Sequence, residues 1–505
     1  MKNFLKITTI FFAFILLMPS CDNFIEVDPI GPVSDDYFNS KEDYENALIG
    51  AYDLLQASFW NVLTGVVASD DFAAGGDPFN YDQPTLQNVD LMIQTPADNN
   101  QLRDIWQLMY AGLNRANFVL EFENKTEFSG RDEIIAQAYF LRAYFTFELV
   151  KFYGNIPLKI DESSGTKRIL NKRTLFGEQF DINRTQDIAE AYSLIEEDLK
   201  QAILNLPVVQ DFKYKVTKGA AQALLGKVYL YHGKFDQTKF GDAATVLGKV
   251  IASNEYSLVT GDDYLNLFNS SGENGSESVF EIQYSGVEGA SWNCITCSEG
   301  SYFVKFNGPR SPYDDSTYEA GWGFNIPSQE LYDSFDANDL RRQVTFLDLR
   351  DVPDSYSPSR DNSGFFNKKY LPNKNDPRAG SDPLNYANNY RAIRYADVLL
   401  MAAEAEAQSG GGNAVNYLNQ VRARAFGNNT HDYSSGEGDI LEAIYNERRL
   451  EFAGEGLRFF DLVRTGKAAS RINGFTNNKN EVFPIPQVEL ELANAVDKWG
   501  QNPGY

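Results

Sequence analysis

The stretch IIAQAYFLRAYFTFELVKFYGNIPL, residues 134–158, decides the fold class of this chain. Its apolar residues recur at intervals of three and four, which is the period of one face of an α-helix. They are Ile134, Ala138, Leu141, Phe145, Leu149 and Phe152. Gly154 and Pro157 end the pattern, because glycine and proline commonly stop a helix. The stretch therefore predicts a long helix over residues 134–152 and favours a mainly α protein.

The same periodicity predicts helices on both sides of this stretch. One helix begins at Lys41, and four others cover residues 101–123, 188–206, 218–232 and 441–452. We expect Thr217 to cap the helix over residues 218–232, since a threonine side chain accepts a hydrogen bond from the first turn. Gly233 is expected to end the same helix.

Two segments resemble tetratricopeptide units, which are hairpins of two packed helices. The first covers residues 225–250, where the small Gly226 would let the two helices approach closely. The second, weaker unit consists of residues 396–408, the glycines 410–412 and residues 414–425. Two such units predict stacked helical hairpins rather than a closed bundle.

Two regions lack long helical patterns. Residues 254–388 are rich in glycine, serine, asparagine, aspartate, proline and aromatic residues, and residues 57–99 are interrupted by glycine and proline. Within the first region we expect a short strand over residues 278–284 and a short helix over residues 328–335. Long loops inside a folded protein usually carry function, so these regions are where we expect a ligand.

The N-terminal residues resemble a bacterial lipoprotein export signal. Lys2 and Lys6 precede an apolar run over residues 7–18, which is too short to span a bilayer. Cys21 follows Ser20, as in a lipobox, although residues 18–20 depart from the commoner Leu-Ala-Gly. We predict a signal peptide over residues 1–20, lipidation of Cys21 and a tether over residues 21–40. The alternative is an ordinary signal peptide followed by a free or disulfide-bonded Cys21.

Composition excludes several classes of function. Lysine and arginine number 45 against 70 acidic residues, so the formal charge is −25, and such a surface repels nucleic acid. Only His232 and His431 are present, which argues against a histidine zinc site or a Ser-His-Asp triad. After Cys21, Cys294 and Cys297 are the remaining cysteines, and their spacing allows a small disulfide loop. We expect no cofactor and no metal.

A set of segments spread along the chain carries a family resemblance. The most specific is residues 138–158, and the others are residues 219–231, 390–405, 419–425, 447–462, 483–486 and 501–505. In sequence and in order, they resemble the SusD/RagB family of outer-membrane nutrient-binding lipoproteins. Their joint coverage of the chain, more than any one segment, supports the resemblance.

The resemblance implies an SusD-like fold, in which four tetratricopeptide-like hairpins support a large irregular, aromatic-rich region that holds the ligand. It implies a non-enzymatic lipoprotein on the outer face of the outer membrane, associated with a TonB-dependent SusC-like transporter. The ligand is expected to be a glycan, and some family members handle peptides. We assign one domain to residues 41–505, with a helical scaffold at about 41–253 and 389–470. The irregular region covers about 57–99 and 254–388.

A sugar ring presents a face of C–H groups that an aromatic ring covers, while carboxylates and amides bind its hydroxyls. Residues 69–81 and 284–324 combine such side chains with glycine-rich loop sequence. Our candidate ligand contacts are Trp292, Trp322, Tyr302, Tyr313, Tyr318, Phe324, Asp70, Asp71 and Tyr81. For the aromatic residues the alternative is packing into the core. For the two aspartates the alternatives are turn formation and calcium binding, the former being commoner.

One cluster of charges follows the second hairpin. It comprises Glu447, Arg448, Arg449, Arg458 and Asp461, and we interpret it as a structural ion-pair network rather than an active site. Three other functions stay open. These are peptide uptake on the same fold, a surface hydrolase with paired carboxylates, and a tetratricopeptide scaffold that binds only protein.

Overall fold

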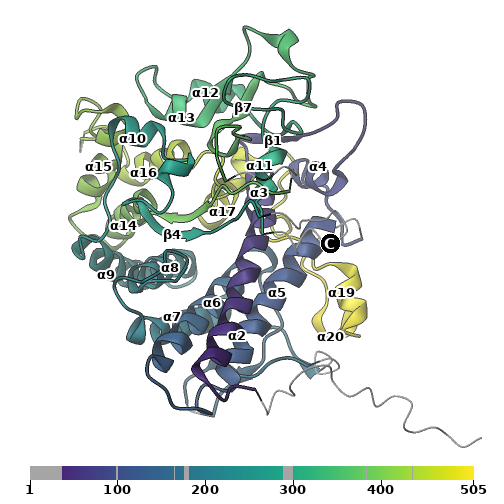
Figure 1. Ribbon diagram of the computed structural model, residues 1–505, viewed down its shortest axis with the longest axis vertical. Helices are drawn as coiled ribbons and strands as arrows, with labels where there is room; N and C mark the ends of the chain where they lie inside the picture. Colours follow the sequence, from purple (N-terminus) through teal and green to yellow (C-terminus); the bar gives the residue numbers. More distant parts are fainter. Residues whose placement is uncertain are drawn as a thin grey trace, which may run out of the picture.

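The computed structural model describes residues 37–97, 100–163, 165–175, 181–287, 299–378, 380, 384–434 and 436–505. The predicted signal peptide and Cys21 lie outside these residues, as does most of the predicted tether. The predicted mainly α fold is confirmed (Figure 1). Helices pack side by side in the lower half of the view, and short strands and helices form the upper half.

The lower half is a layer of helices that pack side by side in sequence order. It consists of α2 (Lys41–Asp53), α5 (Asn100–Glu121), α6 (Arg131–Tyr153), α7 (Ile188–Asn205), α8 (Lys218–His232) and α9 (Lys239–Ala252). α2 packs on α5, and from α5 to α9 each helix packs on the next. α6 contains the stretch that predicted the fold, and it is buried on nearly every face because α5 and α7 cover it. Gly112 of α5 makes this possible, since a Cβ atom there would lie 2.5 Å from the Phe145 ring.

The hairpin of α8 and α9 confirms the first tetratricopeptide prediction. The Thr217 hydroxyl accepts a hydrogen bond from the Ala220 amide at 3.1 Å, and Gly233 follows the last residue of α8. A Cβ atom on Gly226 would lie 2.5 Å from the Leu247 side chain of α9. Glycine at this position therefore sets how closely the two helices approach.

The second predicted hairpin is also present. α14 (Tyr395–Ser409) ends at Gly410, whose φ of 77° is readily adopted by glycine, and α15 (Ala414–Phe426) returns along it. α14 packs on α9 as well, so the two hairpins stack. The remaining C-terminal helices are α16 (Ile440–Glu451), α17 (Arg458–Arg464), α18 (Ala468–Arg471), α19 (Gln487–Leu492) and α20 (Val496–Trp499).

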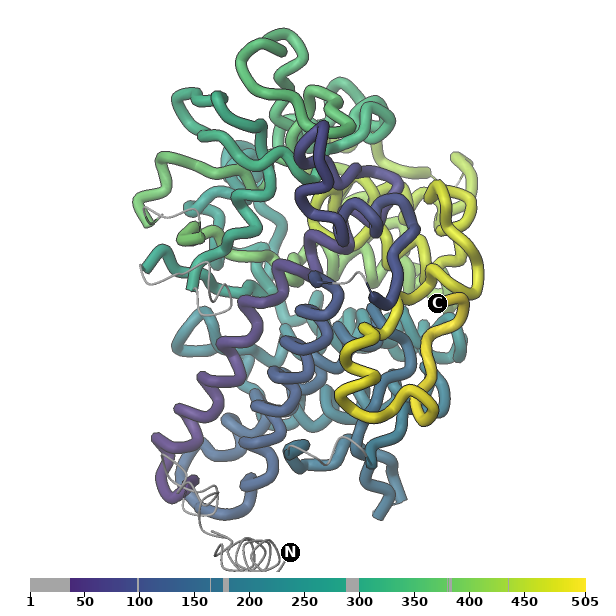
Figure 2. Tube along the Cα trace, turned by 90° about the vertical axis from the view of Figure 1, so that its right-hand side faces the viewer, coloured from purple at the N-terminus to yellow at the C-terminus, as the bar shows by residue number. Residues whose placement is uncertain are grey.

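The end of the chain returns to the first helices (Figure 2). The C-terminal segment lies beside α5, where the amide of Gln487 donates to the carbonyl of Pro96 at 3.0 Å. Arg103 of α5 also pairs with Glu489 of α19, at 2.7 Å between Nε and Oε1. Among the described helices, none combines the length and the apolar character that crossing a membrane requires.

The described residues contain four two-stranded antiparallel sheets; three of them, with several short helices, belong to the upper half, and the second lies beside α7 in the lower half. The pairs are β1 (Phe72–Gly75) with β5 (Phe324–Pro327), β2 (Ile160–Asp161) with β3 (Arg168–Ile169), β4 (Ser278–Ile282) with β8 (Tyr390–Arg394), and β6 (Phe346–Asp348) with β7 (Phe365–Asn367). The helices are α4 (Pro84–Asp90), α10 (Gly261–Leu265), α11 (Phe303–Phe306), α12 (Gln329–Asp333) and α13 (Arg341–Thr345). β4 and α12 confirm the predicted short strand and short helix.

Residues 57–99 are less irregular than expected. α3 (Phe59–Val67) and α4 lie within them, following a turn of 3₁₀-helix over Leu54–Ser58. All nine residues of α3 are buried, including polar Asn61 and Thr64, and the helix is shorter than the stretch over which a helical period is usually read. Gly65 of α3 crosses a neighbouring segment, because a Cβ atom there would lie 2.6 Å from the carbonyl oxygen of Gly456. Gly50 of α2, in contrast, has nothing within 4 Å of such an atom.

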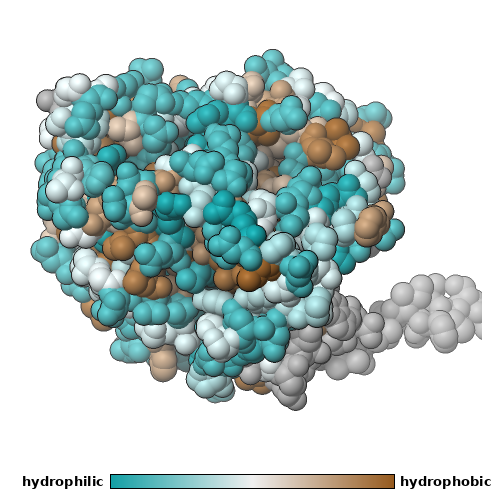
Figure 3. Space-filling model, turned by 90° about the horizontal axis from the view of Figure 1, so that it is seen from above, coloured by the Kyte–Doolittle hydropathy of each residue, from teal (hydrophilic) through white to brown (hydrophobic). Residues whose placement is uncertain are grey.

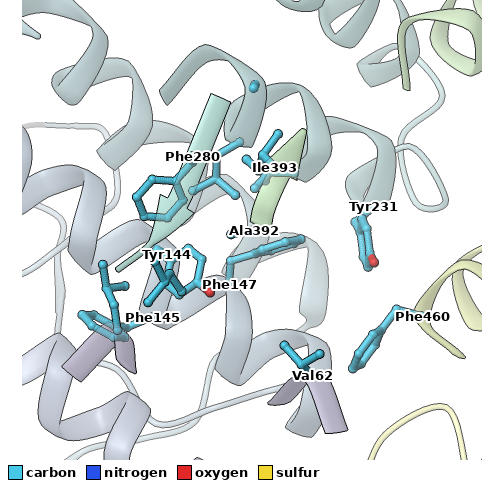
Figure 4. Packing of buried hydrophobic residues seen from close by; sticks show 14 of the residues in the cluster. Val62, Tyr144, Phe145, Phe147, Tyr231, Phe280, Ala392, Ile393 and Phe460 are labelled. Atoms are coloured by element: carbon cyan, nitrogen blue, oxygen red, sulfur yellow. The ribbon is translucent and has the colours of Figure 1, made fainter. Parts of the chain in front are cut away.

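Aromatic side chains join the two halves (Figure 4). The ring centroids of Tyr144 in α6 and Phe280 in β4 are 5.9 Å apart, with 73° between the ring planes. Phe147 of α6 meets Tyr231 of α8 at 5.1 Å and 81°. Edge-to-face pairs of this kind each contribute about 0.5–1.5 kcal/mol beyond the apolar area they bury.

A buried ion-pair network fixes the second hairpin against β4 and β8. Glu451 accepts hydrogen bonds from Arg394 at 2.9 Å and from Arg424 at 2.6 Å, and all three side chains are at most 2% exposed. Glu277 binds the same two arginines, at 2.7 Å and 3.1 Å. The predicted charge cluster is also built of ion pairs: Glu447 binds Arg341 at 2.6 Å and Arg448 binds Asp461 at 3.0 Å, while Arg449 and Arg458 bind aspartates before β1.

Asp397 of α14 is part of the same interior. Its carboxylate lies 2.8 Å from the Lys227 ammonium of α8 and 2.8 Å from the Arg448 guanidinium of α16. Burial alone would raise the pKa of Asp397, but the two cations outweigh it and lower the pKa to about 2. The carboxylate therefore links three helices as an anion.

Candidate ligand-binding site

The two loops that the sequence singled out meet at the pairing of β1 with β5. Gly75 lies opposite Phe324, and Phe72 lies opposite Pro327. The Gly76 amide extends the pairing by donating to the Gly323 carbonyl at 2.8 Å. Segments about 250 residues apart in sequence are thereby held side by side (Figure 1).

Two glycines make the turn after β1 possible. Gly75 and Gly76 have φ angles of 75° and 87°, which side chains rarely tolerate. A Cβ atom on Gly76 would lie 2.6 Å from the Phe324 ring. Only glycine lets the backbone approach this ring so closely.

A pocket of about 460 Å³ opens beside this turn, and we call it the Trp322 pocket. It is lined by Asp82, Gln83, Arg310, Ser311, Gly321, Trp322, Phe324 and Ser357. The Trp322 ring packs edge-to-face on Phe306 of α11, with centroids 5.1 Å apart. The lining combines an indole with a carboxylate, an amide, a guanidinium and hydroxyls, which suits a ligand with apolar faces and hydroxylated edges.

The polar groups of the Trp322 pocket are held in place by each other. Arg310 donates from Nη2 to Asp77 Oδ2 at 2.9 Å and from Nη1 to the Gly76 carbonyl at 3.2 Å. The hydrogen bond from Arg310, aided by the Phe79 amide, lowers the pKa of Asp77 to about 2. Asp82 accepts from the Asp77 amide at 3.0 Å, which closes the loop between them.

The rim of the pocket carries exposed aromatic side chains. Phe79 is 89% exposed and Tyr81 is 51% exposed, on the loop that leads into Asp82 and Gln83. The Arg360 guanidinium lies over the Tyr81 ring, 4.5 Å from its centroid. Viewed from above, the molecule shows small hydrophobic patches separated by hydrophilic surface (Figure 3).

α4 supports β1 from beneath. Asp90, its last residue, accepts a hydrogen bond from the Ala74 amide of β1 at 2.8 Å. Burial, which exceeds the effect of that hydrogen bond, and the nearby charge of Asp361 raise the pKa of Asp90 to about 7.

Several predicted site residues lie in the interior around the pocket. Tyr302 is 2% exposed, Phe324 is 3% exposed and Tyr313 is 6% exposed. Tyr302 packs edge-to-face on Phe59 of α3 at 4.5 Å, and burial raises the pKa of its phenol. Tyr318 is partly buried beside Tyr313. Of the predicted aromatic contacts, the structure thus brings Trp322 and Phe324 to the pocket wall and Tyr81 to its rim.

The carboxylates of Asp70 and Asp71 bind arginine side chains of the protein itself. Asp70 forms two hydrogen bonds of 2.8 Å with Arg458, and Asp71 binds Arg449 through Nε at 2.8 Å and Nη2 at 2.5 Å. Burial opposes ionisation of Asp70, but Arg458 outweighs it and lowers the pKa of this carboxyl. The Asp71 side chain is 1% exposed and fixes the start of β1. Ligand contact at these two residues stays a prediction.

Trp292, Cys294 and Cys297 lie outside the described residues. Arg310, Gln83 and Asp82 were not singled out from the sequence, because polar residues in loops carry no periodic signal. Only their position inside or beside the two aromatic-rich segments could have suggested them.

A second pocket, of about 530 Å³, lies between α5 and the C-terminal helices. Trp106, Tyr110 and Trp499 contribute to its walls, which are largely apolar. Gln107 donates a hydrogen bond of 2.9 Å to Glu489 across this second pocket. Because sugar hydroxyls need polar partners and five of the eight residues lining the Trp322 pocket carry polar side chains, that pocket is the better candidate for a glycan.

The described residues contain no group of three or more histidine, cysteine, aspartate or glutamate side chains placed to hold a metal ion. The two histidines have separate surroundings. His232 is buried against Glu196, at 2.5 Å between Nδ1 and Oε1, and His431 stacks on Phe426 at 3.8 Å.

Comparisons with known proteins agree with this architecture. Residues 350–505 match a family model described as the SusD family, and residues 23–230 match one described as starch-binding associating with outer membrane. A relative named SusD-like protein P2, from Formosa agariphila, is 29% identical over 549 residues, with both chains fully covered.

Solved structures are similar over almost the whole chain. A laminarin binding SusD-like protein is 33% identical, with a TM-score of 0.79, covering 93% of this chain and 100% of its own. Surface glycan-binding protein A from Bacteroides thetaiotaomicron, in complex with laminarihexaose, is 27% identical with a TM-score of 0.78. That match covers 92% of this chain and 99% of the other.

These matches and the fold define a class of protein in which stacked helical hairpins carry an irregular region built from distant loops. The chain belongs to the SusD family, which confirms the resemblance seen in the sequence.

Proposed function

We propose that this protein is a non-catalytic, lipid-anchored surface protein that binds a glycan and delivers it to a TonB-dependent SusC-like transporter of the outer membrane. The Trp322 pocket carries the proposal, because it places an indole face beside hydrogen-bonding groups that are already fixed in position. The names of two similar solved proteins mention laminarin or laminarihexaose, so laminarin is the first ligand to test.

The chemistry of the pocket favours binding over hydrolysis. Hydrolysis by paired carboxylates needs one carboxylic acid whose pKa is raised, so that it can protonate the leaving group. Asp77 has a pKa lowered to about 2, and it is committed to Arg310. Asp82 is committed to the Asp77 amide and to Gln87. These groups suit hydrogen bonds to sugar hydroxyls rather than proton transfer.

Affinity electrophoresis tests the proposal. The chain beginning after Cys21 would be run through gels containing laminarin, starch, fructan or plant polysaccharides. Trp322→Ala is expected to weaken binding about 30-fold, as loss of a central aromatic contact of about 2 kcal/mol would. Trp499→Ala removes a tryptophan from the second pocket and serves as the matched control, with binding expected to be unchanged. Equal retardation of wild type and Trp322→Ala would contradict the assignment of the pocket, and retardation by no glycan would favour a peptide ligand.

The anchor and the partner need separate tests. The proposal of an anchor rests on the N-terminal sequence up to Cys21. Radiolabelled palmitate is expected to enter wild type and not Cys21→Ser. Detergent extracts of the native cells are expected to yield the protein together with a barrel transporter. Isolation without such a partner would contradict the delivery role.

A further inference from the structure

Tyr81 projects from the rim of the Trp322 pocket in a defined setting. Tyr81 is 51% exposed, and the next two residues, Asp82 and Gln83, line the pocket. The loop that carries it is closed by the hydrogen bond of 3.0 Å from the Asp77 amide to the Asp82 carboxylate. The backbone beneath the ring is therefore fixed, while the ring itself still has to be held.

Arg360 supplies the contact that holds the ring. Its guanidinium carbon lies 4.5 Å from the ring centroid, within the range of a cation–π interaction, and it occupies one face of the ring. The Arg360 amide donates to the Gly76 carbonyl at 3.0 Å, and Arg310 donates to the same oxygen. The arginine is thus tied to the same turn that leads into the Tyr81 loop.

The Arg360 side chain has no competing ion pair. In the described ranges, no carboxylate lies within 4.0 Å of its guanidinium, and its buried Nε makes no hydrogen bond there. Arg310, by comparison, is paired with Asp77 at 2.9 Å. Among the described residues, no ion pair of Arg360 therefore competes with its contact to the Tyr81 ring.

A ring with one face covered by a cation and half of its surface open can receive a sugar ring on the other face. We propose that Arg360 is a positioning residue that holds Tyr81 as a stacking platform for a pyranose ring at the rim of the Trp322 pocket. This inference rests on the proposed glycan-binding function. Holding the ring before binding removes the cost of ordering it afterwards, which corresponds to an affinity gain of about three- to tenfold.

A double-mutant cycle with laminarin as the probe tests the role. Arg360→Gln is expected to weaken binding about three- to tenfold, and Arg360→Lys, which keeps a cation, is expected to recover part of the loss. Tyr81→Phe keeps the ring and is the matched control. In a Tyr81→Ala background, Arg360→Gln is expected to have no further effect, because the arginine acts through the ring. An equal loss in both backgrounds would overturn the positioning role.

A measurement without ligand separates this proposal from the proposed function. Nitration of Tyr81 by tetranitromethane, followed by peptide mass spectrometry, reports how open the ring is. Arg360→Gln is expected to raise the nitration rate of Tyr81 at an unchanged unfolding midpoint, and laminarin is expected to protect Tyr81 in wild type. Equal nitration rates in wild type and Arg360→Gln would overturn the role of Arg360 alone. Failure of wild type to bind any glycan would overturn the proposed function and the platform with it.

Discussion

Replacing Glu451 by glutamine tests how much the buried ion-pair network stabilises this fold. The substitution keeps the size of the side chain and removes the charge that Arg394 and Arg424 share. Removing one partner of a buried ion pair costs about 3–5 kcal/mol, because the remaining charge is left without compensation. Glu277 still binds both arginines, so we expect the lower end of that range, about 3 kcal/mol.

Thermal and denaturant unfolding of wild type and Glu451→Gln would measure this loss, which is expected to lower the thermal midpoint by roughly 3 °C. Glu127→Gln is the matched control, since Glu127 is 84% exposed in its pair with Arg131. We expect the control to change stability by at most about 0.5 kcal/mol. A loss below about 1 kcal/mol in Glu451→Gln would refute the argument, because it would mean that the arginines are not stranded by removal of the charge.

Further predictions concern pH and packing. Because the pKa of Asp397 is lowered to about 2, its charge stabilises the fold above about pH 4. About 2 kcal/mol of the unfolding free energy is expected to be lost as the pH falls towards 2. If the unfolding free energies of wild type and Asp397→Asn changed in parallel with pH, this prediction would be contradicted. Because the pKa of Asp90 is raised to about 7, its contribution is present below about pH 4 and is lost as the pH rises through 7. Asp90→Asn should therefore gain on the order of 4 kcal/mol relative to wild type at pH 8 and nothing at pH 4, and a gain independent of pH would refute it. Gly65→Ala is expected to lower the unfolding free energy by about 2 kcal/mol, because its Cβ atom would clash with a backbone oxygen. Gly50→Ala, on an open helix face, should raise it by about 1 kcal/mol. Equal effects of the two substitutions in denaturant unfolding would rule out the packing argument.

The helical scaffold could be predicted from the sequence wherever a helix is long and its ends carry capping or helix-breaking residues. α8 was predicted to the residue, because Thr217 caps it, Gly233 ends it and its apolar residues keep the helical period. α3 was missed because its nine residues are fewer than the roughly 11 to 18 over which a helical period is usually read, and because all nine are buried, polar Asn61 and Thr64 included. Burial of that kind depends on neighbours that the local sequence does not specify.

The candidate site could be predicted only at the level of segments. Aromatic, glycine-rich sequence indicated the loops that meet at β1 and β5. It could not distinguish Tyr302, which α11 turns against α3, from Tyr81, which stays exposed. The partners of Asp70 and Asp71 belong to helices more than 370 residues further along the chain, so their ion pairs could not be inferred locally.

That separation has a consequence for how the chain folds. The hairpins of α8 with α9 and of α14 with α15 involve neighbours in sequence, whereas the Asp70–Arg458 pair closes a span of 388 residues. Contacts between residues so far apart in sequence form slowly, because the chain between them loses conformational entropy before the contact contributes stabilising energy. The helical layer is therefore expected to assemble first and the pocket last. Retention of a ligand would then distinguish fully folded molecules from compact intermediates that already have most of their helices.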